Sequence, residues 1–213
     1  RTDGRLVRVA PFVDRITWGE ISPDGKVTPK VYPEKEGEEV HFWPGPAGGK
    51  EWTHAAYSPR TQLFYAPVQE VGAKVARRRR EFKEGIPYWG ASVTVDSEDM
   101  YGYVGAFDPA NGKEAWRWRN EVPMCASVLA TGGDLVFAGE PTGEFNALDA
   151  RTGELLWQFQ CGSGHHSSPI TYSVDGRQYV AVPVGWGAWT EGFLPSMLGA
   201  PHGDALFAFA LPE

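Results

Sequence analysis

The residues with the most evident ligand chemistry are a cysteine and two histidines in the stretch CGSGHH: Cys161, His165 and His166. Thiolates and imidazoles are the side chains that hold structural zinc, and zinc sites space them in close pairs such as C-x-x-C. This stretch has neither a C-x-x-C nor an H-x-x-x-H spacing. The residue types would suit zinc, but their spacing disfavours it.

The second cysteine of the chain, Cys125, allows one disulfide at most. The sequence does not show whether Cys125 and Cys161 meet. Two separate buried thiols are the expected arrangement, because free cysteine is among the most buried residue types.

Four consecutive arginines, Arg77 to Arg80, form the strongest local concentration of charge. Like charges repel one another, so an exposed loop over residues 72–89 is expected. The alternative interpretation is a docking patch for an acidic protein partner.

Two stretches, AFDPANGKEAW from Ala106 to Trp116 and ALDARTGELLW from Ala147 to Trp157, carry alanine, aspartate, glycine and tryptophan at matching places 41 residues apart. Between the aspartate and the tryptophan lies a turn, in which Gly112 or Gly153 can take the positive φ that other residues resist. Each copy therefore predicts a strand, a tight turn and a second strand.

A period of about 40 to 45 residues occurs in helical solenoids and in the four-stranded blades of β-propellers. No helical period is present, and the flanking runs DLVFAGEPTGEFNALDA and GRQYVAVPVG are rich in β-branched and aromatic residues. The fold class is therefore predicted to be all-β, as part of a propeller. Leu206 to Phe209 begin a third copy, and Arg1 to Leu6 match the turn of an earlier one, so we expect about three blades in an incomplete ring.

The composition is that of a globular chain, with 42% hydrophobic residues and nine tryptophans among 213 residues. A net charge of −7 argues against nucleic acid as the main partner. No run of 18 apolar residues exists, so no membrane span is expected. The first residues do not form an export leader, so any export signal is expected to have been removed or to lie further upstream.

The stretch WGAWTEGFLPSMLGAPHG, from Trp186 to Gly203, is an insertion between two predicted strands of the last blade. An insertion of this length that carries tryptophan, phenylalanine, leucine and methionine is expected to cover something. Loops at one end of a propeller channel line its binding site. We therefore expect residues 186–203 to lie over the mouth of the channel.

These segments together resemble the quinoprotein alcohol dehydrogenases, eight-bladed propellers that bind pyrroloquinoline quinone (PQQ). The stretch from ASVLATGGDLVF to DARTGELLWQF, followed by GSGHHSSPITYSVDGRQYVAVPVGWGAW, is similar to the closing blades of that family. RTDGRLVRVAPFV and EWTHAAYSPRTQLFYAP resemble segments further upstream. The resemblance implies that residues 1–213 are the C-terminal blades of a dehydrogenase propeller with tryptophan-docking repeats of about 41 residues.

The resemblance also implies a reaction and its setting. An alcohol would be oxidised to an aldehyde or ketone in the periplasm, with two electrons passing to PQQ and then to a cytochrome c. A calcium or lanthanide ion would act as Lewis acid and an aspartate as base. The family's metal ligands, its aspartate and its adjacent cysteine pair match no position here, so an upstream propeller chain or segment is expected to supply them. The alternative is a non-catalytic propeller scaffold that binds proteins, which would not need the loop over the channel mouth.

Several cofactor-contacting positions of the family do have counterparts. Glu51 and Trp52 stand where the family has Asn-Trp, Trp189 matches a tryptophan near its end, and Cys125 stands where some members stack a tryptophan under the quinone. Leu198, in the same loop as Trp189, is expected to share the substrate pocket with it. Glu51 would need a proton, a cation or hydrogen-bond donors beside a cofactor that carries three carboxylates.

Trp116 and Trp157 recur with the repeat and are expected to serve packing between blades. Trp52 and Trp189 lie in segments that do not repeat, and we expect both to face the cofactor. A flat quinone is held well by an indole face, which contributes about 0.5–1.5 kcal/mol beyond area burial if it follows aromatic pairs in general.

Replacing Trp189 with alanine in the assembled enzyme should weaken PQQ binding or activity more than it lowers thermal stability. The measurements are quinone binding, dye-coupled alcohol oxidation and the melting temperature. Full activity with a lowered melting temperature would place Trp189 among the packing residues instead.

Overall fold

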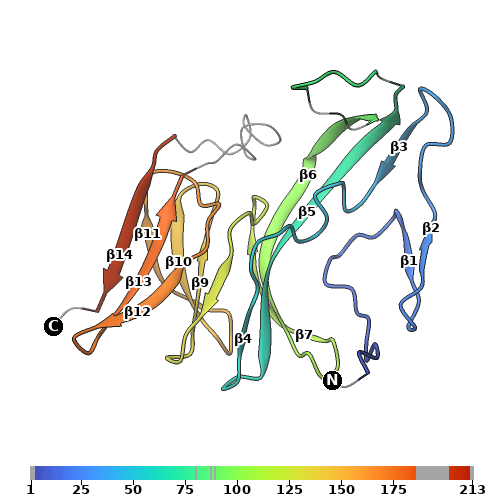
Figure 1. Cartoon of the computed structure of the whole chain (residues 1–213). Coiled ribbons are helices and arrows are strands. Elements are labelled where there is room, and N and C mark those ends of the chain that lie inside the picture. The colour runs from blue at the N-terminus through green and yellow to red at the C-terminus, as the bar shows by residue number, and fades with distance from the viewer. Residues whose placement is uncertain (1–2, 80, 87, 89, 186–201, 212–213) are drawn as a thin grey trace. The chain divides into compact units, whose positions relative to one another are not determined.

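The computed structural model describes residues 3–79, 81–86, 88, 90–185 and 202–211 (Figure 1). The described residues form strands and turns and no helix, so the predicted all-β class is confirmed, and none of them forms a helix that could cross a membrane. Internal contacts divide the chain into two compact units, Arg1–Gly49 with Glu70–Met100 and Lys50–Gln69 with Tyr101–Glu213. Two long strands, β5 (Leu63–Arg77) and β6 (Ala91–Phe107), contribute to both units.

The first unit begins with a short hairpin. Its strands β1 (Gly19–Ile21) and β2 (Val27–Pro29) pair antiparallel around a turn in ISPDGKVTP. Ser22 closes this turn, because its backbone N–H donates to the Lys26 carbonyl at 2.9 Å. A further strand, β3 (Glu39–Phe42), pairs with the distal end of β5, with Phe42 opposite Ala73.

The exposed loop predicted over residues 72–89 begins later than expected, because β5 continues to Arg77. Ala73 and Ala76 are buried, and Gly72 lies against Trp43 so closely that a Cβ there would come within 2.4 Å of the indole. The strand persists because β3 pairs with residues 73–76 and Trp43 packs on Gly72. Arg78 and Arg79 are exposed beyond its end.

The arginine run forms hydrogen bonds within its own unit. The Arg77 guanidinium donates to the Glu34 carbonyl at 2.8 Å, and the Arg79 backbone N–H donates to the Glu36 carboxylate at 2.8 Å. These two bonds join the end of β5 to the stretch YPEKEGEEV, and the docking patch stays a prediction.

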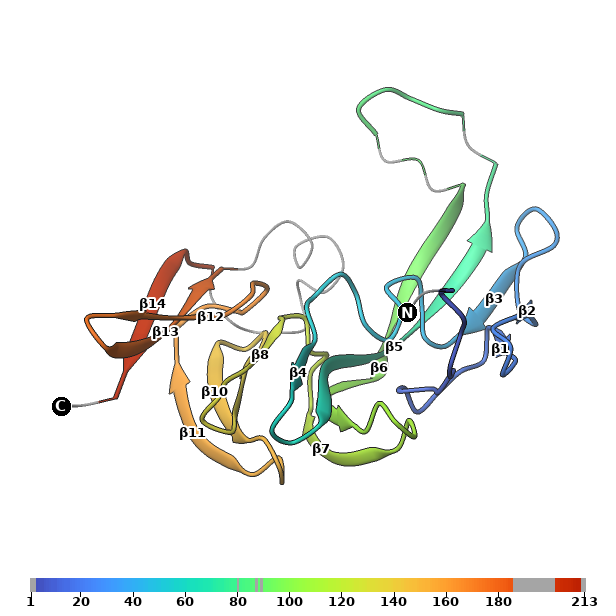
Figure 2. The same ribbon diagram turned by 60° about the horizontal axis from the view of Figure 1, so that its bottom comes forward.

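The second unit consists of three antiparallel sheets (Figure 1). The first combines the proximal part of β5 and the distal part of β6 with β4 (Ala56–Ser58) and β7 (Glu114–Asn120). The second, in the order β11-β10-β9-β8, contains β8 (Val128–Ala130), β9 (Leu135–Gly139), β10 (Glu144–Asp149) and β11 (Leu155–Gln160). The third, seen in Figure 2 with the second, contains β12 (Ile170–Val174), β13 (Arg177–Val184) and β14 (Ala205–Ala210).

The two copies of the repeat adopt the same hairpin, as the sequence predicts. Ala106 pairs with Trp116 and Ala147 with Trp157, and each strand pair shifts register directly after the alanine. Gly112 and Gly153 have φ of 75° and 76°. In each turn the aspartate carboxylate accepts backbone N–H groups, as Asp149 does from Arg151 at 2.8 Å and Thr152 at 2.9 Å.

Apolar side chains fill both spaces between the three sheets, as face-to-face packing of sheets requires. Between the first and second sheets lies a cluster that contains Tyr65, Val104, Trp116, Met124, Val136 and Leu148. Between the second and third lies a cluster of Phe137, Phe145, Ala147, Val180, Val182 and Val184. This stacking matches the arrangement of consecutive propeller blades.

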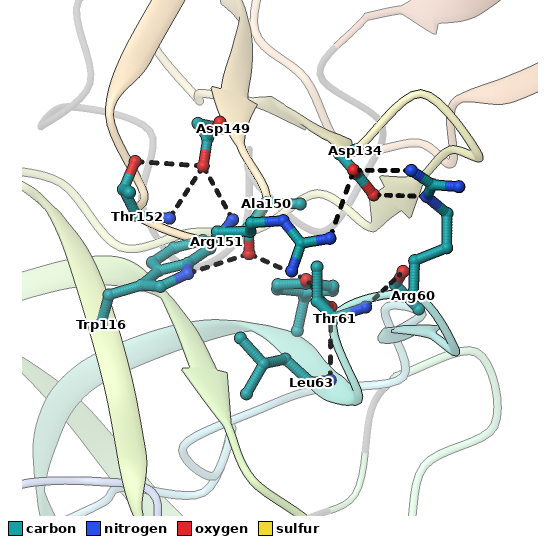
Figure 3. Close-up of polar contacts among 11 residues, drawn as sticks. Arg60, Thr61, Leu63, Trp116, Asp134, Asp149, Ala150, Arg151 and Thr152 are labelled. Atoms are coloured by element: carbon teal, nitrogen blue, oxygen red, sulfur yellow. Dashed lines mark hydrogen bonds and ion pairs between the residues drawn. The ribbon is translucent and has the colours of Figure 1, made fainter.

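Trp116 joins the first sheet to the second (Figure 3). Its indole is 8% exposed and donates its Nε1–H to the Ala150 carbonyl at 3.1 Å, which also accepts the Tyr65 hydroxyl at 2.9 Å. A Cβ at Gly153 would lie 2.5 Å from the indole, so the turn glycine also makes room for the ring. Trp157, the equivalent residue of the next sheet, packs against Phe209 at 5.1 Å between ring centroids and is 38% exposed.

Replacing Trp116 with alanine should lower the free energy of unfolding by about 3 to 5 kcal/mol, because it opens a cavity in the first core and leaves the Ala150 carbonyl with fewer donors. Trp157→Ala is the matched control and should cost clearly less, since its ring is already 38% exposed. Urea unfolding followed by circular dichroism gives both values. Equal losses would show that the Trp116 contact has no special part in joining the sheets.

Candidate functional site

Three loops of the second unit each precede the first strand of one sheet: residues 50–55 before β4, residues 121–127 before β8 and residues 161–169 before β12. Hydrogen bonds join them at Ser127, whose hydroxyl accepts the His54 backbone N–H at 2.8 Å and the Ser168 hydroxyl at 2.8 Å. The Ser127 backbone N–H donates to the Ser167 carbonyl at 3.1 Å. We call these three loops the loop junction.

His54 completes this connection. Its Nδ1 lies 3.0 Å from the Ser168 hydroxyl, and its carbonyl accepts the Val128 backbone N–H at 3.1 Å. The His54, Ser127 and Ser168 group was not predicted from the sequence. A usable signal was present, since a Ser or His lies one or two residues before the first strand of each sheet in WTHAA, MCASV and HHSSP.

Trp52 and Glu51 lie in the first of these loops. The Trp52 indole is 57% exposed, and its backbone N–H donates to the Glu51 carboxylate at 2.7 Å. The adjacent Lys50 ammonium donates to the carbonyls of Glu51 and Thr53. Glu51 is half-buried and has one of the hydrogen-bond donors that its position was expected to need, while a cationic partner stays a prediction.

His166 meets Trp52 from the third loop. The two rings are perpendicular, with an interplanar angle of 88° and centroids 5.4 Å apart, which is the favoured edge-to-face geometry. Burial lowers the pKa of His166, and the nearby Glu51 carboxylate opposes that shift. The shift favours the neutral form of the imidazole.

His165 points into the protein instead. It is 1% exposed, stacks on Phe145 with centroids 5.5 Å apart, and its Nε2–H donates to the Gly143 carbonyl at 3.3 Å. A Cβ at Gly139 would lie 2.4 Å from the imidazole, so this glycine makes the close approach possible. Burial lowers the pKa of His165 to about 4. The two adjacent histidines thus have different surroundings. From the sequence alone they could be considered only together, as possible zinc ligands.

A buried carboxylate supports the turn on which His165 rests. Glu140 is 8% exposed and accepts hydrogen bonds from the side-chain amides of Asn120 and Asn146, the latter at 2.7 Å. Its own backbone carbonyl accepts the His165 N–H at 3.0 Å. Burial raises the pKa of Glu140, and the two amide hydrogen bonds oppose the shift. The acidic character of this residue gave no sign of its burial.

Both cysteines are free thiols, as expected from the sequence, but only Cys125 has the expected burial. Cys125 is 4% exposed, and burial raises its pKa to about 12. Cys161 is half-buried, with a pKa raised by burial to about 11. Neither thiol forms a thiolate near neutral pH, so neither suits nucleophilic chemistry. Cys125 belongs to the loop junction, two residues before Ser127, but its side chain is buried.

Trp189 and Leu198, and most of the loop at 186–203, lie outside the described residues. Within the described part of the chain, no three His, Cys, Asp or Glu side chains gather closely enough to hold a metal ion. The loop junction offers the exposed Trp52 indole with the half-buried His166 ring beside it. The exposed indole face can stack on a flat aromatic ligand.

Comparison with known proteins shows what the chain is similar to. Residues 120–180 match the family model described as PQQ glucose/ethanol/alcohol dehydrogenase, beta-propeller domain. The chain is 37% identical over 230 residues to the quinoprotein alcohol dehydrogenase PedH of Pseudomonas putida. This alignment covers all of this chain and 38% of PedH. It is 37% identical over 228 residues to a quinoprotein ethanol dehydrogenase of Pseudomonas putida, covering all of this chain and 37% of the relative.

A solved structure is similar as well. A europium-containing methanol dehydrogenase superposes with a TM-score of 0.84 and 31% sequence identity, over 95% of this chain and 40% of its own. The chain thus spans less than half the length of the relatives it matches.

Acidification should destabilise the protein through His165. Above pH 6.5 the imidazole is neutral in the folded and the unfolded states, and its contribution to stability is complete. Between pH 6.5 and about 4 the unfolded chain binds a proton at this imidazole and the folded chain does not, so stability falls. The shift from 6.5 to about 4 corresponds to a loss of about 3 kcal/mol.

His165→Phe, which keeps an aromatic ring beside Phe145, should remove this part of the pH dependence. The measurement is the free energy of unfolding in urea at several pH values between 4 and 7.5, for both proteins. If both lose stability in parallel, His165 is not the titrating group.

Proposed function

Because the chain belongs to the PQQ β-propeller family of quinoprotein alcohol dehydrogenases, we propose that it forms part of an enzyme that oxidises an alcohol to an aldehyde or ketone. The observation that carries this proposal is the similarity over the full chain, at 37% identity, to proteins named for that activity. The chain spans less than half the length of those proteins, so we propose that the complete activity needs sequence beyond this chain.

The loop junction supports a place for PQQ. A planar aromatic cofactor needs an accessible ring face, and the Trp52 indole is 57% exposed at the point where three loops meet. When bound, PQQ would supply the two-electron redox chemistry. Trp52 would stack on it, and Glu51 would hold the backbone of the loop through the Trp52 N–H. Cys125 and Trp189 are further proposed contacts, and Leu198 is proposed to line the substrate pocket with Trp189.

The remaining parts of the reaction are assigned outside the chain. A solved relative is named for its europium, which supports a lanthanide or calcium ion beside the quinone. We propose that its ligands and the catalytic aspartate come from upstream blades, which would also complete an eight-bladed ring. A cytochrome c would accept the electrons, the enzyme would be periplasmic, and residues 186–203 would cover the channel mouth.

A chimera tests the proposal. The segment of PedH that aligns with this chain is replaced by this chain, and the product is assayed for PQQ binding and for dye-coupled alcohol oxidation with calcium or a lanthanide. We expect PQQ to bind and the metal to be required for turnover. A chimera that melts cooperatively but binds no PQQ would favour the scaffold interpretation, and the isolated chain oxidising alcohol as a stable monomer would contradict the need for other blades.

In the same chimera, Trp52→Ala should weaken PQQ binding about two- to tenfold, the range that corresponds to about 0.5–1.5 kcal/mol for an aromatic pair. Its melting temperature should change little, because the indole is 57% exposed and buries little area. Trp116→Phe serves as a packing control, with the opposite pattern expected. Unchanged PQQ affinity in Trp52→Ala would remove Trp52 from the cofactor site.

A further inference from the structure

The contact between His166 and Trp52 joins a firmly held residue to a weakly held one. The Trp52 ring is 57% exposed, and it contacts His166 edge to face with centroids 5.4 Å apart. An exposed indole on a loop can turn about two side-chain torsions, so its orientation depends on the few groups that touch it.

The backbone on the N-terminal side of His166 is anchored by His165. Burial of that imidazole against Phe145, its hydrogen bond to the Gly143 carbonyl at 3.3 Å and the bond from its backbone N–H to the Glu140 carbonyl at 3.0 Å fix this position. Glu140 is fixed in turn by two side-chain amides.

The backbone on the C-terminal side is anchored by two serines. Ser167 donates its hydroxyl to the Pro183 carbonyl and accepts the Ser127 N–H at 3.1 Å through its own carbonyl. The Ser168 hydroxyl donates to Ser127 at 2.8 Å. His166 is therefore held between fixed neighbours on both sides, and its half-buried ring forms a rigid wall beside Trp52.

We propose that His166 is a positioning residue that fixes the plane of the Trp52 indole for a flat aromatic ligand. The inference rests on the proposed function for the identity of the ligand, PQQ, but the ordering of Trp52 is a property of the ligand-free chain. A ring that is already oriented loses less side-chain entropy on binding, so the contact contributes to affinity without touching the ligand.

The first test measures Trp52 without any ligand. The chain is labelled with ¹⁵N-tryptophan, and the order parameter of the Trp52 indole N–H is determined by relaxation in the wild type, His166→Ala and His166→Phe. We expect the order parameter to fall in His166→Ala and to be restored in His166→Phe, which keeps a ring at the same place. Urea unfolding should give the same midpoint for all three, because the folded loop is held by His165, Ser167 and Ser168.

The second test measures PQQ affinity in the chimera with PedH. His166→Ala should weaken binding about two- to tenfold, the loss expected for one side chain that must become ordered on binding, and His166→Phe should bind like the wild type. If the wild type binds no PQQ, the proposed function fails, while a fall of Trp52 order in His166→Ala still supports the positioning role. A Trp52 indole that is equally ordered in His166→Ala overturns the inference even if PQQ binds, and so does a loss of affinity that phenylalanine does not restore.

Discussion

The Trp116 indole lies on the turn of the neighbouring sheet and donates its N–H to the Ala150 carbonyl at 3.1 Å, with Gly153 leaving space for the ring. A buried indole needs a hydrogen-bond acceptor, and a stack of sheets needs a contact that fixes one sheet against the next. This single contact meets both needs. Around it, Arg60 and Arg151 bind Asp134 at 2.8 and 3.4 Å, but these ion pairs are exposed and contribute little by themselves (Figure 3).

The loop junction depends on this packing. Loops that start each sheet come within hydrogen-bond distance only if the sheets are held in a fixed stack, and Ser127 then bonds to both neighbouring loops at once. His165 is buried against Phe145 and so also holds the third loop to the second sheet. The exposed Trp52 and the half-buried His166 are thus positioned by a rigid framework, which suits a site that must hold a flat ligand in one orientation.

The sequence predicts well the features that arise locally. Aspartate and glycine determine the repeated turns, because the carboxylate binds nearby N–H groups and glycine accepts a φ near 75°. The paired strands and the all-β class follow from them. The buried role of Trp116 was also predictable, since it recurs with the repeat.

Features that depend on distant residues could not be predicted in the same way. The extension of β5 to Arg77 depends on contacts with earlier residues such as Trp43. The four arginines made the same residues look like an exposed loop in the sequence. The separation of His165 from His166 depends on Gly139 and Phe145, and the burial of Glu140 depends on amides 20 residues before it and six after it. The cofactor contacts predicted at Glu51, Trp52, Cys125, Trp189 and Leu198 stay predictions, because they came from a family resemblance rather than from the chemistry of the residues alone.

Hydrogen exchange at the indole N–H groups, followed by NMR on the ¹⁵N-tryptophan-labelled chain, tests directly whether Trp116 joins the sheets. If the sheets are joined as described, the Trp116 indole N–H exchanges only through global unfolding, because it is buried and bonded to Ala150, and the half-exposed Trp157 and Trp52 exchange much faster. A Trp116 indole that exchanges as fast as Trp52 would contradict the account, since the sheets would then separate without unfolding and could not hold the loop junction in place.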